Sequence, residues 1–166
     1  MGSSIQRQDC PVDGRTASQR PKAMAERLRE AAAALIAVVE SIDEDRWRRV
    51  PQPGVWSIGK DAEHVAEAAI YHQWIVRVTI GQAASSRRPA IERNQMTTGR
   101  SPREVVELLH ERTQEGARLL LDLTEEQLEL PTRPPRAWGQ VLAETIERVL
   151  ISHYDTHRLV IEEKLR

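Results

Sequence analysis

Four long segments of this chain carry apolar residues at helical spacing, and stretches rich in proline, glycine and polar residues separate them. The segments cover residues 21–42, 57–80, a third stretch that opens at Ser101, and 139–164. No segment alternates apolar and polar residues between turn signals, as a half-buried strand does. Amphipathic helices of this length bury their apolar faces against one another. The sequence therefore predicts an all-α fold, a four-helix bundle.

Local signals predict several helix ends. Pro21 suits the first turn of the first helix, Ser57 is a good N-cap for the second, and Gly81 marks the end of the second. The run Ser101-Pro102-Arg103-Glu104 is a capping box with proline at the first helical position. A second capping box, Thr124 to Gln127, predicts a further short helical turn.

The links between the helices bear on the topology. Two prolines and a glycine in the link 43–56 favour an interpretation without regular helix there, and Pro134 and Pro135 break the chain before the last helix. The link 82–100 is long enough to cross the bundle. We therefore do not expect a simple up-down-up-down order.

The length of 166 residues fits one domain, with the bundle over residues 21–166. Residues 1–20 are polar without an apolar period and predict a flexible, disordered N-terminal tail. Cys10 is the only cysteine, and the N-terminus has no apolar signal core. Both features favour a reducing compartment, so we expect the protein in the cytoplasm.

Charge and hydropathy argue against two classes of partner. The net charge is −1, and the chain shows no basic stripe and no recognition-helix signature, so we expect no nucleic-acid binding. No stretch approaches the roughly 18 uncharged apolar residues of a membrane-spanning helix, so we expect no membrane association.

The last predicted helix carries two histidines within its apolar stripe. The stripe follows Leu142, Ile146 and Val149 and continues through His153 and His157, which are one turn apart and are predicted to face the core. A histidine pair at this spacing can place both imidazoles on one metal ion. The alternative is a hydrogen-bonded pair near the solvent end of the bundle.

His64 lies in the second predicted helix, where a facing helix would allow it to complete a three-histidine site. Three protein ligands leave a coordination position for water or substrate, which is typical of catalytic zinc. Taken on this helix alone, its neighbours Asp61, Glu63 and Glu67 favour a surface histidine instead.

Other polar residues have open roles. Asp61 is placed to accept a hydrogen bond from His64 or to cap its helix, and the cap is the favoured interpretation. His72 and Tyr71 are candidates for a pocket wall, although core packing is commoner for tyrosine. His110 is interpreted as a surface residue. Four arginines make the link 82–100 basic, and a solvated loop is favoured over an anion site: Arg87, Arg88, Arg93 and Arg100.

Trp56-Ser57 followed by His64, together with His153-x-x-x-His157 on the last helix, resembles the DinB/YfiT-like superfamily over about residues 22–166. The resemblance implies a four-helix bundle in which His64, His153 and His157 bind Zn, Ni or a similar divalent ion, often as a homodimer. The superfamily contains low-molecular-weight-thiol S-transferases and maleylpyruvate isomerase-like enzymes.

We therefore expect a metal-dependent enzyme that acts on a small-molecule substrate, with thiol S-transfer favoured because no glutamate is placed as clearly as the base of an HExxH motif. A metal-dependent hydrolase is the first alternative. The others are a non-catalytic, dimerising metal-binding bundle and a plain bundle whose histidines are core polar groups.

Overall fold

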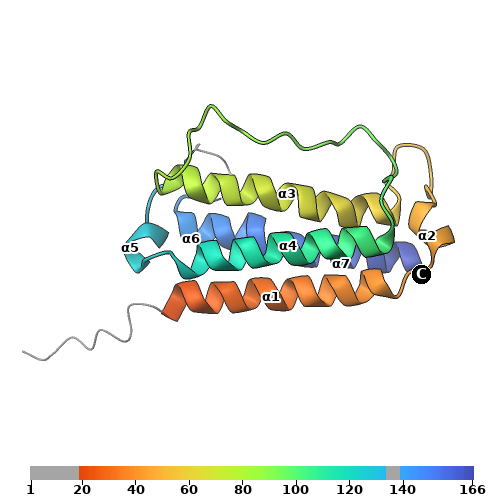
Figure 1. The fold of residues 1–166 in the computed structure, drawn as a ribbon, viewed down its shortest axis with the longest axis horizontal. Coiled ribbons are helices and arrows are strands. Elements are labelled where there is room, and N and C mark those ends of the chain that lie inside the picture. The colour runs from red at the N-terminus through yellow and green to blue at the C-terminus, as the bar shows by residue number, and fades with distance from the viewer. Residues whose placement is uncertain (1–18, 134–138) are drawn as a thin grey trace, which may run out of the picture.

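A computed structural model describes residues 19–133 and 139–166. Four long helical segments lie side by side: α1 (Gln19–Glu40), α3 (Ile58–Thr79), α4 (Pro102–Leu121), and a last segment made of α6 (Leu142–Thr145), the π-helical η1 (Ile146–Ile151) and α7 (Ser152–Leu165) (Figure 1). These ranges contain no strand, only one isolated bridge, from Pro131 to Val141. The prediction of an all-α four-helix bundle is confirmed.

Some predicted features lie outside the described residues: Cys10, Pro134, Pro135 and the tail up to residue 18. The first helix begins at Gln19, two residues before the predicted start.

The long link 82–100 led us to expect that the bundle departs from up-down-up-down order, and it does. In Figure 1 this link runs back along the whole length of α3, so that α3 and α4 point in the same direction. The helix α1 contacts α4 and α7, and α3 contacts the same two helices from the other side. The last helix therefore packs against both α1 and α3.

The predicted helix ends are present. The Ser57 hydroxyl accepts a hydrogen bond from the Lys60 backbone N–H at 3.1 Å, and Ser101 and Glu104 form the reciprocal capping box. The second capping box opens the short helix α5 (Glu125–Leu128). Beyond α3, Gly81 adopts a φ of 78°, a left-handed conformation that glycine enters without steric cost.

The prediction that the link 43–56 has no regular helix is wrong, because this link contains the short helix α2 (Glu44–Arg48). Asp43 caps this helix by accepting a hydrogen bond from the Arg46 backbone N–H at 2.8 Å. The prolines at 51 and 53 follow the end of α2, so they restrict only the chain beyond it.

Trp47 of α2 is fully buried and fixes this end of the bundle. Its indole N–H donates to the Arg100 carbonyl at 2.8 Å. The ring also presses against α3 at Gly59, where an added Cβ would lie 2.6 Å from a ring carbon. Gly59 is therefore needed for this close approach.

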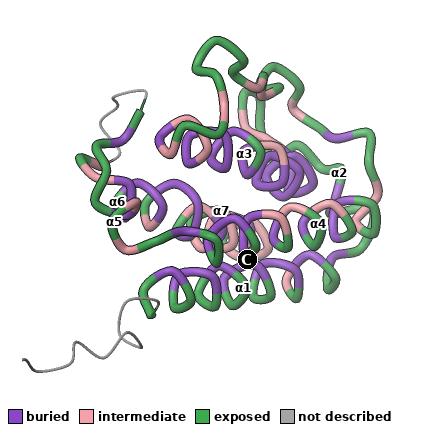
Figure 2. Tube along the Cα trace, turned by 60° about the vertical axis from the view of Figure 1, so that its left-hand side comes forward, coloured by how far each residue is buried: buried purple, intermediate pink, exposed green. Residues whose placement is uncertain are grey.

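The helix α3 is buried on almost every side, whereas α1 and α4 alternate between buried and exposed residues (Figure 2). The link 82–100 explains the difference, because it is bonded to both ends of α3. The Ser57 N–H donates to the Met96 carbonyl at 2.8 Å, and the Trp74 indole N–H donates to the Ala84 carbonyl at 3.3 Å. This link thus covers the outer side of α3.

The last helix departs from its predicted register. It begins at Leu142 rather than near 139, and the π turn η1 adds one residue to the helical path. The core positions after η1 are therefore Tyr154 and Ile161, one residue later than the stripe through 153 and 160. The prediction that His153 and His157 face the core is corrected: both are half-buried.

Candidate metal centre

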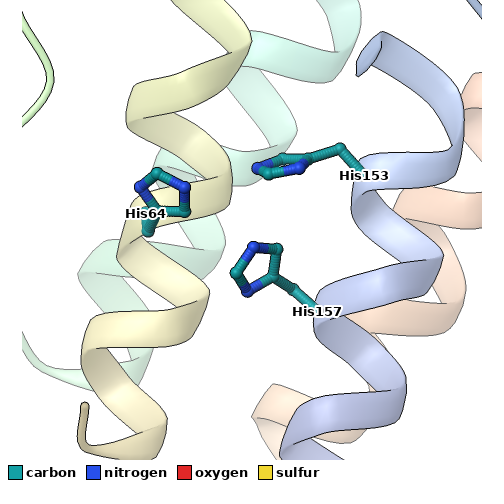
Figure 3. A group of neighbouring side chains, drawn as sticks. All are labelled: His64, His153 and His157. Carbon is teal, nitrogen blue, oxygen red and sulfur yellow. The ribbon is translucent and has the colours of Figure 1, made fainter. Parts of the chain in front are cut away.

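Three imidazoles converge between α3 and α7. His64 comes from α3, and His153 and His157 come from successive turns of α7 (Figure 3). Each offers a nitrogen within 4.8 Å of those of the other two. The ring centroid of His64 lies 5.3 Å from that of His153 and 5.1 Å from that of His157. The centroids of His153 and His157 are 4.6 Å apart. We call these three residues the histidine triad.

The π turn explains why α7 presents its pair to α3. Because η1 moves the core register to Tyr154 and Ile161, the two histidines occupy the flank of α7 beside α3. Figure 3 shows the three rings turned toward a common space, each with a nitrogen facing it. Convergence of residues so distant in sequence is the geometry that a three-histidine site requires.

Each ring of the triad keeps one buried nitrogen without a hydrogen-bond partner among the described residues. These atoms are Nδ1 of His64, Nε2 of His153 and Nδ1 of His157. A buried polar atom left unpaired costs about 1–3 kcal/mol, so a hydrogen-bonded histidine pair does not describe this site. The nitrogens that converge between the three rings, within 4.8 Å of one another, fit a divalent metal ion, which prefers such donors.

The protonation states suit metal binding. Burial is the largest cause that lowers the pKa of His64 to about 4 and of His153 to about 2, and the neighbouring histidines lower both pKa values further. The two imidazoles are therefore neutral at neutral pH, and a neutral ring has a lone pair to donate.

Asp61 is directed toward His157 rather than toward His64. Its Oδ1 lies 3.4 Å from Nδ1 of His157, a close approach without hydrogen-bond geometry. Lys164 donates to the other carboxylate oxygen of Asp61 and, at 2.8 Å, to the Trp56 carbonyl. Asp61 is not the N-cap, which is Ser57, although it lies in the first turn of α3. A carboxylate behind a ligating histidine fixes the orientation of the ring.

His64 is only 4% exposed, so the interpretation as a surface histidine is wrong. Its acidic neighbour Glu63 is equally buried and is paired: Lys60 Nζ lies 3.0 Å from one carboxylate oxygen, and Arg100 bonds the other. In the sequence, Arg100 was placed in the basic link 82–100, and neither Lys60 nor Arg100 was predicted to pair with Glu63. The spacing of three between Lys60 and Glu63 was the available signal.

His72 and His110 have different environments. His72 is buried, its ring lies 5.0 Å from that of His153, and burial is the largest cause that lowers its pKa to about 3. It also lines a pocket with Tyr71 and the link 82–100. His110 is exposed on α4, as predicted.

No helix in the described ranges is long and apolar enough to cross a bilayer. The family model of the DinB superfamily matches residues 27–161, more than half of the chain and including the whole triad. Comparison with curated proteins gave no match, and neither did comparison with solved structures. On the extent of the family match, together with the helical bundle, the chain belongs to the DinB superfamily.

Proposed function

We propose that the protein is a metal-dependent enzyme whose histidine triad holds one divalent ion, and that it transfers a low-molecular-weight thiol to a small electrophilic substrate. The convergence of three imidazole nitrogens within 4.8 Å of one another carries this proposal. Three imidazoles are a ligand set that Zn and Ni accept, and the set leaves a coordination position open. An ion held there lowers the pKa of a thiol or water bound at that position.

The carboxylates around the triad favour thiol over water. Activation of water in a hydrolase is commonly assisted by a carboxylate general base, whereas a thiol with a pKa of about 8.5 loses its proton more readily than water and depends less on such a base. Asp61 is engaged by Lys164, and Glu63 is engaged by Lys60 and Arg100. Neither is free to accept a proton from water.

The reaction is a substitution at carbon. The thiol sulfur forms a bond to the electrophilic carbon, the leaving group departs with the electron pair of the broken bond, and the thiol proton passes to bulk water. The triad and its surroundings orient the sulfur, and the half-buried position beside α3 limits access of competing water.

Metal content of untagged protein tests the triad. We expect the wild type to bind a full equivalent of zinc or nickel after dialysis, and His153→Ala to lose it. His110→Ala is the matched control, because this exposed histidine should leave the metal content unchanged. A full equivalent retained by His153→Ala would show that the assignment is wrong.

Thermal shift with glutathione, mycothiol and bacillithiol tests the chemistry. Saturable stabilisation by one thiol, present only with metal, supports S-transfer. A metal-loaded protein that responds to none of them is instead a hydrolase or a non-catalytic metal-binding bundle, which ester hydrolysis assays separate.

A further inference from the structure

A pocket adjoins the triad between the link 82–100 and α3. Its volume is about 590 Å³, within the range of sites for small molecules. The lining residues come from α3 and from the link: Tyr71, His72, Arg88, Pro89, Ala90, Ile91 and Arg93. His72 belongs both to this lining and to the surroundings of the triad, because its ring lies 5.0 Å from that of His153. A molecule in the pocket is therefore a neighbour of the triad.

The pocket carries positive charge without a compensating acid. Arg88 and Arg93 both line it, and no aspartate or glutamate does. Within residues 19–133 and 139–166, neither arginine forms an ion pair with a carboxylate. The pocket between α3 and α4 differs, since Glu115 and Asp122 line it together with its arginines, and Arg112 is paired with Glu115 at 2.9 Å.

The positions of the two guanidinium groups suit an anion beside an apolar wall. The Arg88 guanidinium lies 4.9 Å from the centroid of the Tyr71 ring, which holds it at the pocket wall. Arg93 lines the same pocket as His72, whose ring lies 5.0 Å from that of His153.

We propose that this pocket binds the carboxylate of a small-molecule substrate through Arg88 and Arg93, with the reacting end of the molecule directed past His72 toward the triad. The planar fork of a guanidinium matches the two oxygens of a carboxylate, and Pro89, Ala90 and Ile91 provide apolar contact for a short carbon chain. The proposal rests on the proposed function, because the triad is where the other end reacts.

Calorimetry with a matched pair of thiols tests the pocket. Mercaptohexanoate carries a carboxylate, and mercaptohexanol has the same thiol and chain without it. We expect the metal-loaded full chain to bind mercaptohexanoate about tenfold more tightly, since hydrogen bonds to a charged group are the stronger kind. Arg93→Gln should remove this preference, whereas Arg87→Gln, outside the pocket lining, should keep it. Arg93→Lys keeps the positive charge but lacks the planar fork of the guanidinium, so it should retain part of the preference for mercaptohexanoate.

The outcomes separate this inference from the proposed function. Equal binding of both thiols by metal-loaded protein, or a preference unchanged in Arg93→Gln, overturns the pocket and leaves the metal site standing. If the wild type binds no metal, the proposed function fails, and hexanoate titrated into the metal-free chain then tests the pocket alone. Hexanoate binding lost in Arg93→Gln supports the pocket, and no binding overturns it. Inorganic phosphate that binds more tightly than hexanoate overturns the carboxylate assignment. Melting temperatures of the variants show that each is folded.

Discussion

Two polar clusters meet on the buried helix α3 and differ in one respect. The first, the ion-pair cluster, consists of Lys60, Glu63, Glu67 and Arg100, and the second is the histidine triad. They meet at consecutive residues of α3, Glu63 and His64, each only 4% exposed. Burial is therefore not what distinguishes them.

The ion-pair cluster satisfies its own charges. Lys60 Nζ lies 3.0 Å from Glu63 and 3.5 Å from Glu67, and Arg100 bonds the second oxygen of Glu63. Burial acts to raise the pKa of Glu63, but hydrogen bonds from Lys60, Thr98 and Arg100 outweigh it, and the pKa is lowered. The buried carboxylate of Glu63, at the centre of this cluster, therefore needs no further partner.

The triad does not satisfy its nitrogens. One buried nitrogen of each ring is without a hydrogen-bond partner among the described residues. Two polar clusters in one environment, one complete and one incomplete, separate a structural role from a binding role. Incomplete pairing, together with the convergence of the three rings, is what identifies the candidate site.

Loss of Lys60 should have the largest effect on stability. The Lys60→Met substitution leaves buried Glu63 with Arg100 as its cation and half-buried Glu67 without the ammonium of Lys60, and we expect the free energy of unfolding to fall by about 3–5 kcal/mol in urea titrations. Arg103→Ala is the control, because its pair with Glu107 is exposed and contributes about 0–1 kcal/mol. A Lys60→Met variant as stable as the wild type would contradict a structural role for the ion-pair cluster.

Acid should affect the two clusters in different pH ranges when metal is absent. His64 and His153 have folded pKa values of about 4 and about 2, so between their ordinary value of 6.5 and these values only the unfolded chain takes up their protons. Stability therefore falls as pH drops below about 6.5. The pKa of Glu63 is lowered in the folded protein, so protonation of Glu63 reduces stability only below pH 4.5, its ordinary pKa. Urea titrations in the presence of a chelator should show that the double variant His64→Ala, His153→Ala loses much of the fall in stability that begins at about pH 6.5. A decline unchanged in that variant contradicts the neutral triad.

Substitution of Asp61 should have the smallest effect. Asp61→Asn keeps the shape but removes the charge behind His157, and we expect zinc affinity to fall about 10–100-fold with one equivalent still bound at saturation. Competition with a chromophoric chelator measures this shift. An Asp61→Asn variant with wild-type affinity would show that the carboxylate serves only Lys164.

The sequence predicts this fold well where the signals are local. Ser57, Gly81 and the capping box of Ser101 and Glu104 act within one helical turn, so their residue types suffice to place the helix ends. The spacing of His153 and His157 likewise follows from one helix, and the resemblance added His64. Nothing local marked the π turn that moves the α7 pair beside α3. The short helix α2 does have a local signal, its N-cap Asp43, but the prediction rested on the prolines and the glycine of the link 43–56.

What the tertiary structure decided depends on partners distant in sequence. Arg100 reaches Glu63 across 37 residues, and Lys164 reaches Asp61 across 103. The link 82–100 folds over α3 and buries acidic residues whose sequence context is typical of a surface. Burial and pairing are properties of the assembled chain, because each requires a second segment to arrive in space. The sequence alone determined the four long helices and which histidines they carry, and only their packing decided which polar groups are satisfied and which are left to bind.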